Sequence, residues 1–145
     1  MNNYVAKTMD KVFVTEKVIT AAHLADLVSG NKSGAVVTFS GNVRNHDGGK
    51  EVSKLSYEIH PSAQDVLTKI VTEVSAGYEI NEVAVAHRYG DIAIGECAFA
   101  VAVSADHREA AFEACSALVN KVKDELPIWK HQVFVDGTDQ WVNFA

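Results

Sequence analysis

The sequence predicts an α+β domain with a largely antiparallel sheet and about three helices. Apolar residues recur at helical 3–4 spacing in three separate segments, and short alternating segments lie between them in pairs. This gives the order β-α-β-β-α-β-β-α-β-β, and hairpins joined by single helices are typical of α+β proteins. A chain of 145 residues is the usual size of one compact domain, and we expect residues 1–145 to form it.

Three segments have the apolar periodicity of helices. Residues 20–29 place their apolar side chains on one side. A clearer amphipathic pattern opens at Pro61, a residue favoured in the first turn of a helix. The longest helix is expected to have Asp106 as its N-cap, with Glu109 as the capping-box partner, and to stop at Pro127. Its predicted core stripe is Phe112, Cys115, Val119, Val122 and Leu126.

The remaining apolar segments alternate with a period of two, as strands do. Residues 51–59 alternate well, and an Asp-Gly-Gly sequence within residues 44–50 predicts the turn that precedes them. The other expected strands are residues 11–16, 34–43, 82–89, 96–104, 128–135 and 140–144.

Composition excludes several classes of protein. The net charge of −6 disfavours non-specific nucleic-acid binding, and no apolar run approaches the ~20 residues that a membrane helix needs. Residues 1–11 lack the apolar region of a secretory signal. Cys97 and Cys115 are too few for a disulfide scaffold and fit no zinc motif, so we expect buried, inert thiols, no bound metal and a reducing, cytoplasmic compartment.

The candidate functional residues are cations. Arg44 lies in a glycine-rich loop, and Arg108 follows His107 in the first turn of the longest helix, where backbone N–H groups favour an anion. Lys123 and Lys130 flank a Pro-x-Trp sequence, and a partly desolvated lysine there would suit acid–base or nucleophilic chemistry. The plainer interpretation is surface ion pairs for the arginines, a solvated helix face for Lys123 and a snorkelling side chain for Lys130.

Three segments together resemble the large, catalytic subunit of molybdopterin synthase. They are GAVVTFSGNVRNH (34–46), VSADHREAAFEA (103–114) and KDELPIWKHQ (123–132), and a DG…WV ending at 136–142 fits the same pattern. The resemblance implies an α/β hammerhead fold and a sulfurtransferase activity. Such an enzyme converts cyclic pyranopterin monophosphate into molybdopterin, and its sulfur comes from a thiocarboxylate on the C-terminal Gly-Gly of a small ubiquitin-like subunit. The resemblance also implies that large subunits dimerise within a heterotetramer of two large and two small subunits, with no further cofactor.

The resemblance also assigns roles to individual residues. Lys123 and Lys130 match the family's catalytic lysines, and Arg44, His107 and Arg108 match residues that contact the substrate. The remaining candidates for substrate binding are Phe39, His131 and Gln132. Gln132 departs from the family pattern, which has Glu there, so it keeps the shape and a hydrogen bond but not the charge.

The spacing along the longest helix predicts that the site is shared. His107 and Lys123 are 16 residues apart, which is roughly 24 Å along a helix, too far for one small pocket. We therefore expect Arg44, Lys123 and Lys130 from one chain and the His107–Arg108 pair from a second copy. The main alternative function is a non-catalytic module that docks a ubiquitin-like tail. A small hydrolase acting on a phosphate ligand is less consistent, because the sequence shows no paired carboxylates and no nucleophile–base set.

Overall fold

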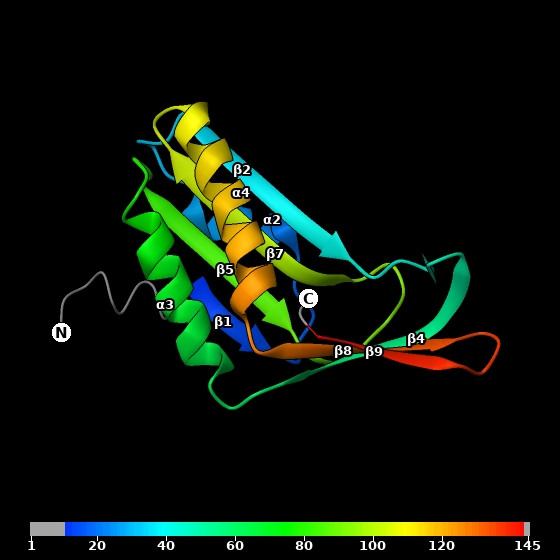
Figure 1. The fold of residues 1–145 in the computed structure, drawn as a ribbon. Coiled ribbons are helices and arrows are strands. Elements are labelled where there is room, and N and C mark those ends of the chain that lie inside the picture. Colours follow the sequence, from blue (N-terminus) through cyan, green and yellow to red (C-terminus); the bar gives the residue numbers. More distant parts are fainter. Residues whose placement is uncertain (1–10, 144–145) are drawn as a thin grey trace.

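The computed structural model, drawn in Figure 1, describes residues 11–143 and confirms the α+β class. These residues form three helices and nine strands. The helices are α2 (Ala21–Val28), α3 (Ala63–Ser75) and α4 (Arg108–Glu125). The strands are β1 (Val12–Thr15), β2 (Ala35–Asn42), β3 (His46–Asp47), β4 (Lys50–Ile59), β5 (Glu82–Arg88), β6 (Gly90–Ile92), β7 (Cys97–Ala105), β8 (Ile128–Phe134) and β9 (Asp139–Asn143).

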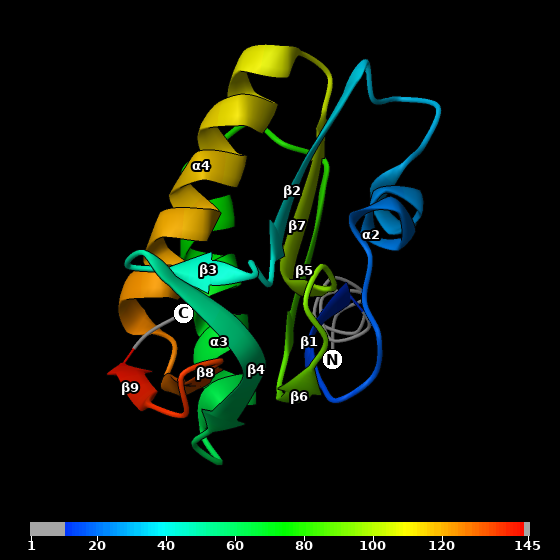
Figure 2. The ribbon, with the colours of Figure 1, turned by 90° about the vertical axis from the view of Figure 1, so that its right-hand side faces the viewer.

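Four strands form a central sheet in the order β1-β5-β7-β2. Strands β1 and β5 run parallel, whereas β5–β7 and β7–β2 are antiparallel. Helices α3 and α4 pack on one face of this sheet and α2 on the other, so the body of the molecule has three layers (Figure 2). None of the helices within residues 11–143 combines the length and the apolar character that a membrane crossing requires.

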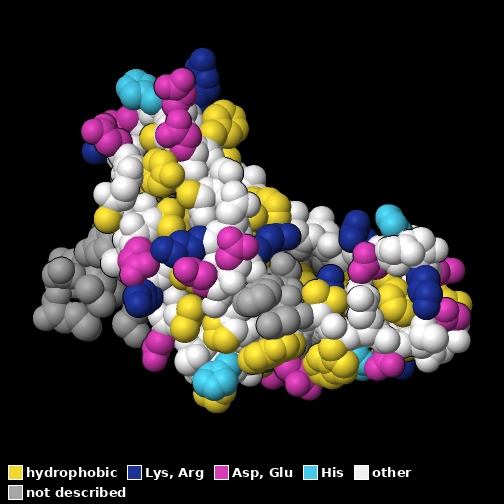
Figure 3. All heavy atoms as spheres, in the orientation of Figure 1, with side chains coloured by type: hydrophobic (Ala, Val, Ile, Leu, Met, Phe, Trp, Pro, Cys, Tyr) yellow, Lys and Arg dark blue, Asp and Glu magenta, His cyan; other side chains and the backbone are white. Residues whose placement is uncertain are grey.

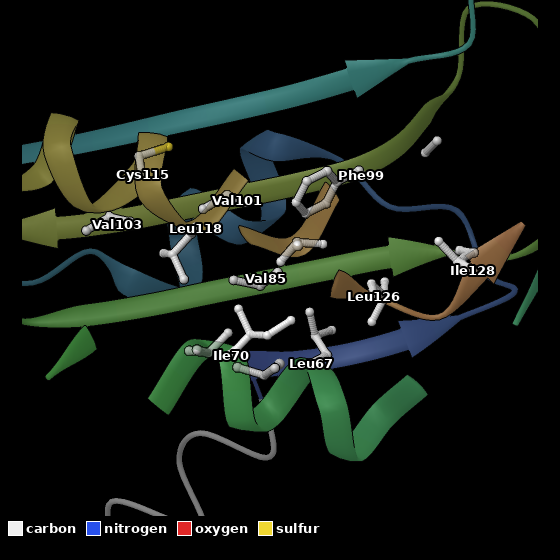
Figure 4. Packing of buried hydrophobic residues seen from close by; sticks show 14 of the residues in the cluster. Leu67, Ile70, Val85, Phe99, Val101, Val103, Cys115, Leu118, Leu126 and Ile128 are labelled. Atoms are coloured by element: carbon white, nitrogen blue, oxygen red, sulfur yellow. The ribbon is translucent and has the colours of Figure 1, made fainter. Parts of the chain in front are cut away.

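The two faces of the central sheet carry side chains of different size, because successive residues of a strand point to opposite faces. The residues that β5 and β7 turn toward α2 are Ala84, Ala86, Ala100 and Ala102. Their small side chains let α2 lie close to the sheet, where Leu24 and Val28 complete a small core. The opposite face carries the main core, and Figure 4 shows its larger residues from α3, β5, β7 and α4 pointing toward one another.

A second sheet has the order β3-β4-β8-β9, with β6 also paired to β4. All of its strand pairs are antiparallel. The long strands β4 and β8 carry this sheet away from the body as an arm (Figure 1). Only Leu126 and Pro127 separate α4 from β8. The Pro127 carbonyl accepts a hydrogen bond from the His60 N–H at 3.0 Å, which joins this corner to the end of β4.

The structure departs from the sequence predictions in a few places. Strands β3 and β6 arise where the sequence predicts a loop and a turn, since each is only a short pairing with β4. The last predicted strand is present as β9, and Phe144 lies outside the described residues.

Two predictions about the longest helix are wrong. His107, not Asp106, is the N-cap, and it makes no side-chain capping bond. The Asp106 carboxylate instead accepts a hydrogen bond of 2.9 Å from the Asn81 amide. Phe112 is not part of the core stripe but is 58% exposed, because the helix turns its Ala111, Ala114 and Leu118 side toward the sheet.

The two cysteines differ from each other. Cys115 is buried, and burial raises the pKa of its thiol, as expected for an inert core cysteine. Cys97 is only partly buried, and the Ser40 hydroxyl donates to its sulfur at 3.3 Å. The expectation of full burial therefore holds for one cysteine and fails for the other.

The entry to α4 is packed against the start of β2. A Cβ atom placed on Gly34 would lie 2.5 Å from the carbonyl oxygen of Asp106, closer than such atoms come in proteins. Only glycine allows the two backbone segments to approach to this distance without moving one of them. The position of the first turn of α4 therefore depends on residue 34 having no side chain.

Candidate functional site

Both predicted lysines lie where the body meets the arm. Lys123 is exposed in the last turn of α4, and Lys130 is the third residue of β8. The intervening residues are fixed, because Leu126 caps the helix and is fully buried, as is Ile128 at the start of the strand. Figure 3 shows basic side chains, with acidic ones among them, around this junction.

Lys130 is partly buried on the inner face of β8. Its neighbour across the strand pair is Tyr57 of β4, which is almost fully buried. Burial lowers the pKa of Lys130, the negative charge of Asp47 opposes that effect, and the positive charges of Arg44 and Lys123 add to it. Lys130 is thus a lysine whose ammonium form is less favoured than in water, and Arg44 and Lys123 lie within electrostatic range of it.

Arg44 is held near this lysine by an acidic residue. Its guanidinium lies 3.6 Å from one carboxylate oxygen of Asp47, and the other oxygen accepts a 2.6 Å hydrogen bond from the Gln132 amide. Gln132 is only 2% exposed and lies two residues beyond Lys130, on the same face of β8. The structure therefore brings together four of the predicted residues, namely Arg44, Lys123, Lys130 and Gln132.

Phe39 connects to this cluster through a row of packed rings. Its ring meets Phe99 edge-on at 5.5 Å, and Phe99 stacks on His87 at 5.3 Å. His87 in turn meets Tyr57 edge-on at 5.0 Å. The row leads from β2 through the core to Tyr57, the strand neighbour of Lys130, so Phe39 is linked to the cluster through packed rings and not by direct contact.

The other predicted residues lie elsewhere. His107 and Arg108 are exposed at the opposite end of α4 from Lys123, as the spacing requires. His131 points to the other face of β8, where it stacks on Trp141 with ring centres 4.3 Å apart and its Nε2 lies 2.8 Å from an Asp139 oxygen. His131 therefore does not share a face with Lys130.

Sequence reasoning missed three residues of this region. Asp47 was part of a turn signal, Tyr57 was one of several alternating strand residues, and His87 ended a strand. Tyr57 pairs with Lys130 through the β4–β8 register, and His87 reaches the region through its packing on Tyr57. No local sequence signal encodes the strand register or the packing. The i,i+3 spacing of Arg44 and Asp47 is the one signal that could have suggested their ion pair.

The sequence and the fold of this chain match one protein family. Residues 14–125 match the model of the MoaE protein family. A molybdopterin synthase catalytic subunit of Bacillus subtilis is 36% identical over 135 residues, covering 92% of this chain and 85% of the relative. The chain belongs to the MoaE family, and its function is accordingly that of a molybdopterin synthase catalytic subunit, a sulfurtransferase of molybdenum cofactor biosynthesis.

Solved structures have the same fold. The crystal structure of molybdopterin synthase from Staphylococcus aureus superposes with a TM-score of 0.84 at 28% identity, covering 92% of this chain and 97% of that one. A chain from the complex of subunits 1 and 2 of the molybdopterin-converting factor of Helicobacter pylori gives a TM-score of 0.69 at 20% identity, covering 90% of this chain and 87% of that one. The second likeness concerns the fold alone.

Proposed function

We propose that the cluster of Arg44, Lys123 and Lys130 is the place where sulfur passes from the thiocarboxylated C-terminus of a small ubiquitin-like subunit to cyclic pyranopterin monophosphate, forming the molybdopterin dithiolene. The observation that carries the proposal is the convergence of these cations around a partly buried Lys130 whose pKa is lowered by burial. Such a lysine can both hold a developing negative charge and give up a proton.

The chemistry needs few groups from this chain. The thiocarboxylate brings its own sulfur nucleophile, so no catalytic cysteine is required. The thiocarboxylate sulfur displaces an oxygen of the precursor, which gives a thioester between the tail and the pterin. Water then attacks the thioester carbonyl, so that the sulfur stays on the pterin and the tail leaves as a carboxylate. Negative charge develops on the displaced oxygen and at the attacked carbonyl, and the Lys123 and Lys130 ammonium groups stabilise it. Arg44 is mostly exposed, with 63% of its side chain accessible, so its guanidinium can hold the substrate phosphate through charge-assisted hydrogen bonds.

The His107–Arg108 pair completes the phosphate site from a second copy of the chain in this proposal. Within one chain, that pair lies at the start of the 18-residue helix α4 and Lys123 lies in its last turn. A dimer that places the start of α4 of one copy beside the end of α4 of the other would bring the cations together. Two such large subunits with two small subunits make the 2+2 heterotetramer that we propose, and the subunit complex of the Helicobacter pylori protein supports a small-subunit partner.

The proposal also covers the chain as a whole. We infer that residues 1–145 act as one molybdopterin synthase large-subunit domain in the cytoplasm, with no metal or cofactor of their own. The low cysteine content favours a reducing compartment, and the net charge of −6 argues against nucleic acid as a partner.

The central experiment combines the purified chain, a thiocarboxylated small subunit and the pyranopterin precursor, and follows the pterin by mass spectrometry. We expect a mass gain that corresponds to two sulfur atoms on the pterin. Binding of the small subunit without any change in the pterin would instead support the non-catalytic docking module.

Lys123→Ala should nearly abolish sulfur transfer while the fold and small-subunit binding persist, because the side chain is exposed and its removal costs little stability. The matched control is Lys69→Ala, which removes an exposed lysine from α3 and should leave transfer unchanged. Circular dichroism and pull-down of the small subunit check folding and binding. Product formation at the normal rate by the Lys123 variant would remove this lysine from the mechanism.

A further inference from the structure

One carboxylate sits inside the cationic cluster and is held there on two sides. Asp47 ends the short strand β3, where its backbone pairs with Lys50 of β4. One of its carboxylate oxygens faces the Arg44 guanidinium at 3.6 Å, and the other accepts the 2.6 Å hydrogen bond from the Gln132 amide. Asp47 thus joins the loop that carries Arg44 to the strand that carries Lys130.

The Gln132 end of this contact is rigid. Gln132 is 2% exposed on a strand paired on both sides, with Leu55 of β4 and Gln140 of β9 as its neighbours. A second hydrogen bond of 3.4 Å links its amide to the Gln140 side chain. The Gln132 hydrogen bond is also the largest cause of the lowered pKa of Asp47, which keeps this carboxylate ionised.

The charge of Asp47 is opposite in sign to the charges of Arg44, Lys123 and Lys130. Burial and the positive charges of Arg44 and Lys123 all lower the pKa of Lys130, and Asp47 is the charged group that raises it. Tyr57, opposite Lys130 on β4, is neutral over the working range because burial raises its pKa to about 12. Asp47 therefore favours the ammonium form of Lys130, against the effect of burial and of the neighbouring cations.

We propose that Asp47, fixed by the buried Gln132 amide, is a positioning residue that orients the Arg44 guanidinium and places a negative charge within the cationic cluster. The inference rests on the sulfur-transfer function proposed above. Asp47 does not touch the reacting atoms in this proposal, and it acts through the two cations beside it.

The Asp47–Gln132 contact allows a test in which the charge is moved but the hydrogen bond is kept. Asp47→Asn removes the carboxylate from β3, and Gln132→Glu adds one on β8. The double variant D47N/Q132E reverses the pair, so that an amide on β3 faces a carboxylate on β8. Each variant is assayed with the thiocarboxylated small subunit for kcat and for KM of the pyranopterin precursor.

We expect D47N to lower kcat about tenfold, because Lys130 loses its counter-charge. KM should change little, because the poorer orientation of Arg44 is offset by the loss of a negative group that competes with the substrate phosphate. The reversed pair should recover kcat to within about threefold of the unmodified chain, because a carboxylate again lies beside Lys130. A residue with a merely structural role would raise KM or reduce folding stability, and reversal of the pair would not restore kcat.

A second measurement is independent of activity. The pKa of Lys130 can be followed by NMR of chains labelled with ¹³C at the lysine ε carbon, with Lys130→Arg to assign the signal. We expect D47N to lower this pKa by about one unit and D47N/Q132E to restore it. Asp91→Asn, which removes an exposed carboxylate from β6, is the control for a general change in charge and should leave the pKa unchanged.

The outcomes separate this inference from the function on which it rests. If the unmodified chain makes no dithiolene, the proposed function fails, and the NMR titration still tests the charge on Lys130. If the unmodified chain is active but D47N matches it in both kcat and Lys130 pKa, Asp47 has no positioning role. Loss of kcat in D47N that the reversed pair does not recover would also overturn the inference.

Discussion

The His87 imidazole is a buried titratable group with one hydrogen bond. It is 0% exposed, and its Nδ1 lies 2.8 Å from the Arg88 carbonyl oxygen. Because a carbonyl only accepts, the proton is on Nδ1, and Nε2 is a buried acceptor without a partner among the described residues. Burial is the main cause that lowers the pKa of His87 to about 4, so the ring is neutral at physiological pH.

This residue should make the fold sensitive to mild acid. In the unfolded chain a histidine takes up its proton near pH 6.5, whereas the folded chain resists it until about pH 4. The stabilisation is complete above pH 6.5 and is lost as the pH falls toward 4, by about 3 kcal/mol in total. Urea titrations at several pH values measure the free energy of unfolding.

His87→Phe is the matching variant, because a phenyl ring can keep the stacking on Phe99 and cannot be protonated. The unfolding free energy of the unmodified chain minus that of the variant should fall by about 3 kcal/mol between pH 7.5 and pH 4. Carboxylates such as Asp136, whose pKa is lowered to about 2 mainly by its Thr138 hydrogen bonds, titrate in both chains and cancel. A constant difference would show that His87 does not titrate as proposed.

At the scale of single residues, the sequence identified the cations but not their surroundings. Arg44, Lys123 and Lys130 were recognised because the chain is acidic and these cations lie next to a glycine-rich loop or a Pro-x-Trp sequence. Asp47 could not be recognised as their counter-charge, because its contact with Gln132 spans 85 residues and requires the β4–β8 register. His131 was placed with the site only because it adjoins Lys130, and strand alternation turns it to the other face.

Among the elements, α4 shows where periodicity succeeds and where it fails. Its apolar spacing predicted the extent of the helix within about two residues, the usual uncertainty of helix ends. Periodicity predicted most of the buried side, since Cys115, Val122 and Leu126 of the expected stripe are buried. It failed in the first turns of the helix, where the alanines at 111 and 114 make the contact that the aromatic residue was expected to make. The aromatic residue at position 112 is left on the surface, where it lines a hollow with Tyr78 and Asn120.

This orientation of α4 gives a stability prediction. Leu118 is 0% exposed beneath the helix, so Leu118→Ala should cost about 3 kcal/mol of unfolding free energy through lost burial and a cavity. Phe112→Ala should cost less than about 1 kcal/mol in dilute solution, since that ring is mostly exposed. Guanidinium unfolding of both variants provides the comparison. A larger cost for Phe112→Ala than for Leu118→Ala would mean that the helix packs with the other side inward.

For the whole molecule, the distribution of cations over both ends of α4 predicts complementation between inactive chains. Lys123→Ala and Arg108→Ala each damage one half of a shared site. If two copies build each site, mixing the variants and allowing subunits to exchange gives half mixed dimers, each with one intact site. Activity should then recover to about a quarter of that of the unmodified chain.

The measurement is the rate of dithiolene formation before and after subunit exchange. Each variant incubated alone provides the baseline, and a mixture of Lys123→Ala with Lys130→Ala is the control, because both of those lysines belong to the same half-site and cannot complement. A mixture of the Lys123 and Arg108 variants that stays as inactive as its components would contradict sharing between two copies.

The close approach of backbone at Gly34 means that the proposed dimer site depends on the absence of a side chain at this position. With alanine at that position, the Asp106 carbonyl must retreat, and the helix that starts two residues later would tilt or slide with it. The core beneath the helix could absorb such a displacement and leave the chain folded. The proposed shared site would be disrupted, because the displaced start of α4 carries the His107–Arg108 pair that reaches the neighbouring subunit. Glycine at residue 34 would then matter less to the chain that contains it than to its companion.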